Sequence, residues 1–285
     1  MSAKPGRAVV RSSDDVADGL RQRTSAAHET PAVAERVSVA RKGRLRRLRK
    51  SLVLIRNPAW RRAARSGVAA TVEHRDVPFG RGIATVVDVG AHHGQFSLLA
   101  RDLYPDADIV CVEPLPTAVE RLRAVHAGDT GVTILPFAAA GAEGRASLHV
   151  SRKTDSSSLL PILKSHVDAF PGTEEARTVD VEARPLDALV SQGLRRPILL
   201  KIDAQGGELE VLRGGGRFLS QVDVAFVECS FVEFYGGQAL ADEVIGAFLQ
   251  HGLRLDGVFS VVRDGSGRCL QADLLFRRPG SVEQE

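Results

Sequence analysis

The chain has 285 residues, 44% of them hydrophobic and 26% charged, which is the composition of a globular protein long enough to bury a sizeable core. Its formal net charge of +3 conceals an asymmetry, because residues 1–75 hold 18 Lys and Arg against 6 Asp and Glu, whereas the rest hold 20 against 29. No stretch approaches the roughly 18–20 apolar residues of a membrane span, and the N-terminus lacks the apolar core of a signal peptide, so we expect a cytoplasmic protein.

The N-terminal part is expected to be an arm. Residues 1–40 mix small, polar and charged residues without periodicity, which predicts disorder. Residues 41–82 are expected to form a basic helical extension, since residues 41–65 hold 11 basic residues and no acidic one. Four apolar side chains share one helical face there: Leu45, Leu48, Leu52 and Ile55. Such a helix could contact a membrane surface or an acidic carrier protein, or pack on the body.

From residue 83 to residue 278 the chain alternates strand-like and helix-like segments, and residues 279–285 are expected to be a disordered tail. The predicted strands cover residues 84–89, 109–112, 132–135, 197–202 and 222–227, with an edge strand over 177–183. The predicted helices cover residues 95–103, 117–126, 186–190, 208–212 and 239–251. Two last strands flank a hairpin turn at 264–267. This alternation predicts a mainly parallel sheet with helices on both faces and an antiparallel last strand.

Four acidic residues lie at the carboxyl ends of predicted strands: Asp88, Glu113, Asp203 and Glu228. In an open α/β sheet, ligands bind beyond the carboxyl ends of the strands. One acidic residue at a strand end is usually a loop or cap residue. Four of them, together with a glycine loop after the first strand, favour a binding site.

The glycine loop reads Asp88-Val-Gly-Ala-His-His-Gly94. Its glycines let the backbone turn tightly and let a ligand approach closely. Glu113 lies where an acidic residue can accept hydrogen bonds from two ribose hydroxyls. That arrangement suits S-adenosylmethionine or NAD, but a nicotinamide fingerprint has a third glycine where this chain has Ser97, and a Tyr-x-x-x-Lys pair is missing.

An NAD-linked oxidoreductase or epimerase is therefore the alternative. A nucleic-acid methyltransferase using the basic arm is a weaker one, because the body is acidic and lacks an Asn-Pro-Pro-Tyr element.

Several motifs together resemble the FkbM family of methyltransferases, over about residues 83–276. They occur in this order: Asp88-Val-Gly-Ala-x-x-Gly-x-Phe96, Glu113-Pro114, Ser156-Ser-Ser-Leu159, Leu186-Asp187 and Lys201-Ile-Asp-Ala-Gln-Gly-Gly-Glu-Leu-Glu-Val-Leu-Arg-Gly214. The resemblance implies a class I methyltransferase (Rossmann-like) fold with seven strands. It also implies O-methylation of a hydroxyl on a natural product, sugar or glycolipid. One departure is His92, where the family commonly has Asn.

The loop and the resemblance together predict the residues that bind S-adenosylmethionine: Asp88, Gly90, Ala91, His92, Gly94, Glu113, Pro114 and Ala138. Methyl transfer needs positioning of the acceptor oxygen, and a general base adds about 10²–10⁴-fold. The candidate bases are Asp203, which we rank first, and then Glu228, His92 and His166.

Two further predictions concern the same region. Asp203 and Glu228 could instead hold a divalent cation, whereas the Cys and His spacing of a zinc site is missing. Residues 155–158 lie in a long insertion after the third strand, and their hydroxyls could close over the cofactor or the acceptor as a lid.

Overall fold

The computed structural model describes residues 58–65, 67–190 and 193–282. Every described residue belongs to one compact unit, Leu52–Glu285. The predictions for the disordered arm over residues 1–40 and for the basic helix with its apolar face lie outside the described residues.

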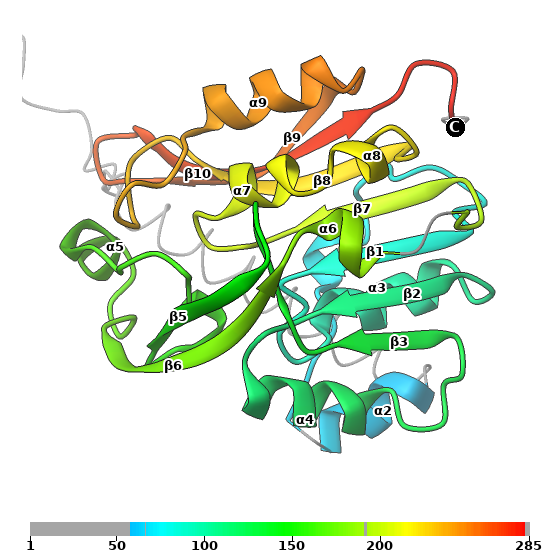
Figure 1. The fold of residues 1–285 in the computed structure, drawn as a ribbon, viewed down its shortest axis with the longest axis horizontal. Helices are drawn as coiled ribbons and strands as arrows, with labels where there is room; N and C mark the ends of the chain where they lie inside the picture. The colour runs from blue at the N-terminus through cyan, green and yellow to red at the C-terminus, as the bar shows by residue number, and fades with distance from the viewer. Residues whose placement is uncertain (1–57, 66, 191–192, 283–285) are drawn as a thin grey trace, which may run out of the picture. The chain divides into compact units, whose positions relative to one another are not determined.

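A seven-stranded sheet forms the centre of this unit (Figure 1), in the order β3-β2-β1-β7-β8-β10-β9. Its strands are β1 (Thr85–Val89), β2 (Asp108–Val112), β3 (Val132–Leu135), β7 (Ile198–Ile202), β8 (Val224–Ser230), β9 (Arg254–Arg263) and β10 (Cys269–Arg277). The strands from β3 to β8 pair in parallel, whereas β10 lies antiparallel between β8 and β9. This order confirms the predicted class I methyltransferase fold, including the antiparallel last strand.

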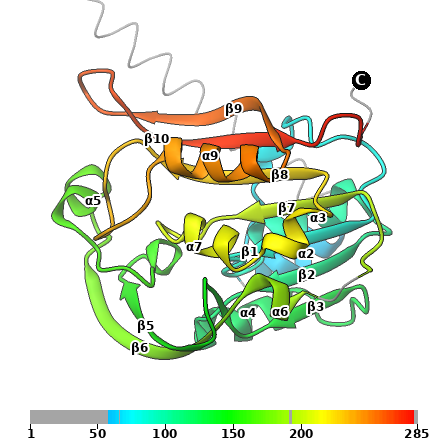
Figure 2. The same cartoon turned by 45° about the horizontal axis from the view of Figure 1, so that its top comes forward.

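Helices cover both faces of the sheet (Figure 2). One face carries the core that includes α6 (Leu186–Leu189), α7 (Glu208–Arg213), α8 (Gly216–Leu219) and α9 (Ala241–Gln250). The other face carries α3 (Gln95–Leu103) and α4 (Pro116–Val125). Strands β1 and β7 are buried along their whole length, as their continuous apolar runs predict for strands covered on both sides.

A second, three-stranded sheet was missed by the sequence-based fold class. It has the order β4-β6-β5, formed by Ala138–Ala139, Glu175–Arg184 and Gly144–Ser151. The predicted edge strand over residues 177–183 is therefore wrong in its place: β6 is the middle strand of this small sheet. Its alternating burial arises because one face packs on residues such as Leu148 while the other is exposed. The connection between β5 and β6 contains η2 (Thr154–Ser156) and α5 (Lys164–Ala169).

The segment before β1 packs on the domain. It contains α2 (Pro58–Arg65) and η1 (Val72–His74), and both Trp60 and Phe79 are almost fully buried. Trp60 Nε1 donates to the Leu98 carbonyl oxygen of α3. The boundary predicted at residue 83 therefore does not separate two packing units among the described residues.

The C-terminal boundary is also later than predicted. Ser281 Oγ donates to the carbonyl oxygens of Asp223 and Arg278, and Val282 packs against the core on the α3 side. The tail predicted to be disordered from residue 279 is thus held on the domain as far as residue 282. None of the helices in the described ranges combines the length and apolar character that a bilayer crossing requires.

Candidate functional site

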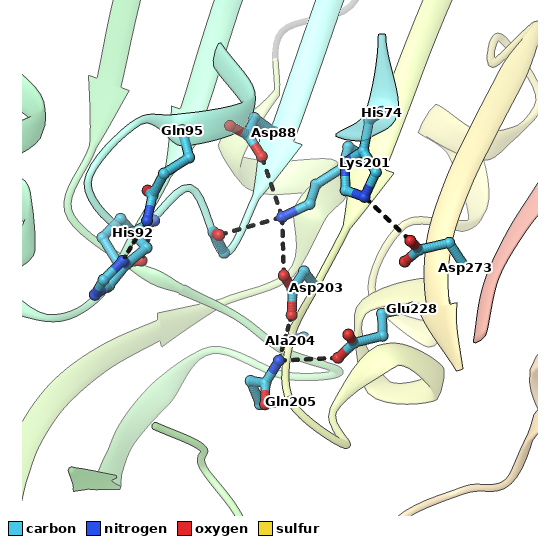
Figure 3. Close-up of polar contacts among 12 residues, drawn as sticks. His74, Asp88, His92, Gln95, Lys201, Asp203, Ala204, Gln205, Glu228 and Asp273 are labelled. Carbon is cyan, nitrogen blue, oxygen red and sulfur yellow. Dashed lines mark hydrogen bonds and ion pairs between the residues drawn. The ribbon is translucent and has the colours of Figure 1, made fainter. Parts of the chain in front are cut away.

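A row of polar side chains crosses four strands of the main sheet where β1, β7 and β8 end (Figure 3). Asp88 of β1 lies opposite Lys201 of β7, and Glu228 of β8 lies opposite Asp273 of β10. Phe226, two residues before Glu228, belongs to the core on the α3 side. Because side chains alternate along a strand, the row faces that same side.

Lys201 supplies positive charge among these carboxylates and is only 8% exposed. Its Nζ lies 3.5 Å from Asp88 Oδ1 and 3.3 Å from Asp203 Oδ2, and 3.4 Å from the Gly90 carbonyl oxygen. Burial by itself would lower the pKa of Lys201, but the carboxylates of Asp203 and Asp88 outweigh burial and raise it. Lys201 therefore stays charged and ties the loop after β1 to the loop after β7.

Asp88 lies beneath the glycine loop, with no exposed surface. Neither of its carboxyl oxygens has a hydrogen-bond partner within the described residues. Burial raises the pKa of Asp88, and Lys201 offsets part of that shift. Its side chain is placed to support Lys201, and a direct contact with a cofactor stays a prediction.

Asp203 and Glu228 are joined by the side-chain amide of Gln205 (Figure 3). Gln205 Nε2 donates to Asp203 Oδ1 and, over 3.1 Å, to Glu228 Oε2. The Asp203 side chain is 33% exposed and pairs with Lys201. Burial, followed by the charges of Asp203 and Asp273, raises the pKa of Glu228 well above its ordinary value. The two predicted catalytic carboxyls are thus neighbours with different environments, and only Asp203 combines solvent access with a paired cation.

This arrangement does not suit a divalent cation shared by the two carboxyls. The amide N–H donors of Gln205 lie between Asp203 and Glu228, where a cation would need oxygen ligands. Among the described residues, no group of three or more His, Cys, Asp or Glu side chains is arranged to hold a metal ion.

The glycine loop is fixed by its backbone. Gly90 has a φ of 73°, and a Cβ added there would lie 1.9 Å from the Asp203 carbonyl oxygen. Only glycine allows the two loops to approach so closely. The amides of Gly90 and Ala91 donate to the Val112 carbonyl oxygen at 2.9 and 3.2 Å, and Gly94 is the N-terminal cap residue of α3.

His92 uses both of its ring nitrogens within the site. Gln95 Nε2 donates to Nδ1 over 3.2 Å, which leaves the hydrogen of the neutral ring on Nε2, 2.9 Å from Thr154 Oγ1. Burial lowers the pKa of His92, so the ring is neutral at neutral pH. Its ring stacks on that of His93 at 3.6 Å. With both nitrogens engaged, His92 is better placed to shape the loop than to accept a proton.

Glu113 joins the loop after β1 to the loop after β2. Its Oε1 accepts a hydrogen bond from the Leu115 amide and its Oε2 from the His92 amide, each at 2.8 Å. Burial raises the pKa of Glu113 to about 7. Each carboxylate oxygen retains a further lone pair, which a ribose hydroxyl could use.

The last two predicted cofactor residues, Pro114 and Ala138, lie in different parts of the domain. Pro114 follows Glu113 and is half-buried. Ala138 lies in β4 and packs with Leu148 and Val181 in the core of the small sheet, not in the polar row. A side-chain role for Ala138 in the site therefore has little structural basis.

The predicted lid over residues 155–158 contacts two strand-end loops, and Thr154 before it contacts a third. Thr154 pairs with His92 of the first loop, and Ser158 Oγ donates to the Gln205 carbonyl oxygen at 2.6 Å. The hydroxyl of Tyr235, which follows β8, lies 3.2 Å from the Ser156 carbonyl oxygen. The segment is thus packed against the candidate site.

His166 belongs to the same insertion and is 3% exposed. Its Nε2 lies 3.2 Å from the Tyr235 hydroxyl and its Nδ1 lies 2.9 Å from Thr173 Oγ1. Burial lowers the pKa of His166. His166 thus reaches Asp203 only through Tyr235 and Gln205, which makes it a poor candidate for the general base.

Sequence reasoning missed three residues of this site: Lys201, Gln205 and Tyr235. Lys201 had a readable signal, because a charge within the strand Ile-Leu-Leu-Lys-Ile must find a buried partner. Gln205 lies in the Lys201–Gly214 motif, but its partners could not be read from that motif. Tyr235 had no signal, since a lone aromatic residue acquires its partners only in the folded chain.

Comparisons with known proteins agree with the resemblance. The model described as Methyltransferase FkbM domain matches residues 88–255. The chain is 28% identical over 160 residues to the 2-O-methyltransferase NoeI of Sinorhizobium fredii (strain NBRC 101917 / NGR234), covering 54% of this chain and 66% of that protein. It is 32% identical over 156 residues to the methyltransferase sdnD of Sordaria araneosa, covering 45% and 59%. The chain thus spans less than two thirds of either relative.

Among solved structures, the methyltransferase FkbM from Methylobacillus flagellatus KT has a TM-score of 0.43 and 15% identity, covering 68% of this chain and 43% of that one. We draw nothing further from so distant a likeness. The family match covers more than half of the sequence and includes the glycine loop, Glu113, Asp203 and Glu228. The chain therefore belongs to the FkbM methyltransferase domain family.

Proposed function

We propose that the protein is an S-adenosylmethionine-dependent O-methyltransferase whose acceptor is a hydroxyl of a natural product, sugar or glycolipid. The observation that carries this proposal is the position of Asp203. Its carboxylate is partly open to solvent, pairs with the buried Lys201, and belongs to a loop whose backbone touches Gly90. Family membership supports methyl transfer, and the 2-O-methyltransferase among the relatives supports a hydroxyl acceptor.

The residues at the ends of β1 and β2 fit the cofactor. The glycine loop leaves no room for a side chain at Gly90, and Glu113 offers an unused lone pair on each oxygen at the ribose position. Gly90, Ala91, His92 and Gly94 would hold the methionine part. Asp88, Glu113 and Pro114 would complete the site, whereas Ala138 packs in the core of the small sheet.

When bound, S-adenosylmethionine supplies a methyl group that its sulfonium already activates. The task of the chain is to orient the acceptor hydroxyl and take its proton. Asp203 is suited to the second role because its carboxylate is partly open to solvent and is held in place by Lys201, 3.3 Å away. Glu228 is half-buried, and its surroundings raise its pKa well above the ordinary value, so it keeps its proton more tightly and is suited to hold its neighbours rather than to act as the base.

Cofactor binding is tested by isothermal titration of the purified chain with S-adenosylhomocysteine, and by its melting temperature with and without that ligand. We expect saturable binding and a higher melting temperature. A shift with NAD but not with millimolar S-adenosylhomocysteine would reject the proposal in favour of an oxidoreductase.

The role of Asp203 is tested by Asp203→Asn, assayed with tritiated S-adenosylmethionine and a panel of methyl glycosides and polyketide alcohols. Turnover should fall by about 10²–10⁴-fold, the usual contribution of a general base, while affinity for S-adenosylhomocysteine changes little. Asp180→Asn is the control, because it removes the same charge from an exposed position on β6. Equal turnover of the two variants would remove Asp203 from the mechanism.

A further inference from the structure

The side-chain amide of Gln205 bridges the two carboxyls of the candidate site. The backbone conformation of Gln205 is held by a residue outside its loop. Its backbone has a φ of 49°, a left-handed conformation that few residues other than glycine adopt. Such a conformation persists where surrounding contacts fix it. Here Ser158 Oγ donates to the Gln205 carbonyl oxygen at 2.6 Å.

The neighbours of the amide decide which way it points. Asp203 and Glu228 present carboxyl oxygens to one end, so that end must be the Nε2 donor. The other end, Oε1, lies 2.6 Å from the hydroxyl of Tyr235, which donates to it. If the amide flipped, its oxygen would face two carboxyls. The two carboxyls therefore set which end of the amide is the donor, and Tyr235 holds the opposite end in place.

Tyr235 is itself fully buried and fixed by the insertion between β5 and β6. Its hydroxyl lies 3.2 Å from the Ser156 carbonyl oxygen and 3.2 Å from His166 Nε2. Thr173 Oγ1 donates to the Phe170 carbonyl oxygen, so it accepts from His166 Nδ1. The neutral ring of His166 therefore carries its hydrogen on Nδ1, and its Nε2 is an acceptor, as are the Ser156 and Gln205 oxygens. The hydroxyl of Tyr235 has one hydrogen to donate, and its shortest contact, 2.6 Å, is with Gln205 Oε1. The insertion thus surrounds Tyr235, and Tyr235 donates to the amide that reaches the two carboxyls.

We infer that Gln205 and Tyr235 are positioning residues of the methyl-transfer site: Tyr235 holds the Gln205 amide in place, and the amide holds Asp203 beside Glu228 in the geometry that accepts the substrate proton. This inference rests on the proposed function. It adds that the 152–174 insertion, which packs around the hydroxyl of Tyr235, acts on catalysis through Tyr235 and Gln205.

The test compares Tyr235→Phe, which removes only the hydroxyl, with Tyr104→Phe. Tyr104 is the other of the two tyrosines in the chain, and its hydroxyl donates to the Gly80 carbonyl oxygen, apart from the polar row. We expect Tyr235→Phe to lower kcat by about tenfold to a hundredfold, with unchanged KM for S-adenosylmethionine and unchanged S-adenosylhomocysteine affinity. Tyr104→Phe should leave kcat as in the wild type.

Gln205→Glu gives a second, independent readout in which Tyr235 is intact. It keeps the size of the side chain but puts a third carboxyl beside Asp203 and Glu228. Like charges at this distance favour protonation, so the acidic limb of the kcat profile should move to higher pH. A purely structural role would lower thermal stability without moving that limb. Wild-type kcat in Tyr235→Phe together with an unmoved limb in Gln205→Glu would overturn the inference.

The outcomes separate the two proposals. A wild-type chain that fails to bind S-adenosylhomocysteine rejects the proposed function, and the inference with it. If the chain binds the ligand but methylates no acceptor in the panel, NMR of the Gln205 side-chain amide tests the inference without an activity assay. Its N–H signals are assigned by their loss in Gln205→Glu. An amide held by these hydrogen bonds gives N–H signals protected from exchange with water, and Tyr235→Phe should make that exchange faster. Exchange rates unchanged by Tyr235→Phe would overturn the inference.

Discussion

The two halves of the candidate site use a buried glutamate in different ways. On the cofactor side, Glu113 receives hydrogen bonds from two loops, through the amides of His92 and Leu115 on separate oxygens. On the catalytic side, Glu208 receives hydrogen bonds only from its own loop. The amides of Ala204 and Gly206 both donate to its Oε1, at 3.1 and 3.0 Å.

The links to neighbouring strands differ accordingly. The glycine loop after β1 is joined to β2 by backbone amides that reach the Val112 carbonyl oxygen. The loop after β7 is joined to β8 through side chains, by way of Gln205. Backbone contacts do not depend on which side chains are present, whereas side-chain contacts can vary. We therefore interpret the cofactor side as a fixed frame and the catalytic side as the part that can be adapted to an acceptor.

The largest expected effect comes from breaking the backbone frame with Gly90→Ala. The new Cβ would clash with the Asp203 carbonyl oxygen at a positive φ, so the free energy of unfolding should fall by roughly 3 kcal/mol or more. Urea denaturation measures the change. Gly128→Ala is the control, since its φ of 83° is similar but no atom lies within 4 Å of the added Cβ. It should cost about 1 kcal/mol, and equal losses would mean that the close approach at Gly90 is unimportant.

Glu113→Gln should have an intermediate effect. One oxygen becomes an NH2 group, so one of the two backbone amides loses its acceptor in a buried place, at a cost of about 1–3 kcal/mol. Affinity for S-adenosylhomocysteine, measured by isothermal titration, should fall roughly tenfold because the same group would hold the ribose. Unchanged affinity would show that Glu113 is structural only.

Glu208→Gln should have the smallest effect, because one amide oxygen can accept both hydrogen bonds that Oε1 accepts now. We expect a change below about 1 kcal/mol near the acidic end of the pH range. A loss as large as that of Glu113→Gln would contradict the proposed difference between the two sides.

The pH dependence of Glu208→Gln sharpens the comparison. Burial raises the pKa of Glu208 from 4.5 to about 7, so the folded chain holds this proton more tightly than the unfolded chain. Its contribution to stability is therefore present below pH 4.5 and is lost as pH rises to about 7. Melting temperatures measured across this window should fall less steeply with pH in Glu208→Gln than in the wild type. Parallel curves would mean that burial does not raise the pKa of Glu208 in the folded chain.

Much of the fold follows from local patterns in the sequence. Continuous apolar runs identified β1 and β7, because strands buried on both faces have no polar side, and the helical spacing after Gly94 matched α3 to the residue. The order of strands and helices then led to the class I fold. The small sheet was not predicted, because β6 alternates like any half-exposed strand and tertiary packing determines which strands pair with it.

For the site, the sequence by itself determined which acidic residues end which strands, and hence that Asp88, Glu113, Asp203 and Glu228 meet at one edge of the sheet. Parallel strands have their carboxyl ends at a common edge, so order along the chain is sufficient for that conclusion. The roles proposed for these residues come from tertiary packing. Those roles depend on burial and on partners such as Lys201, Gln205 and Tyr235, and Tyr235 is 30 residues from Gln205 along the chain. Distances of that kind are set by packing, which no local pattern records.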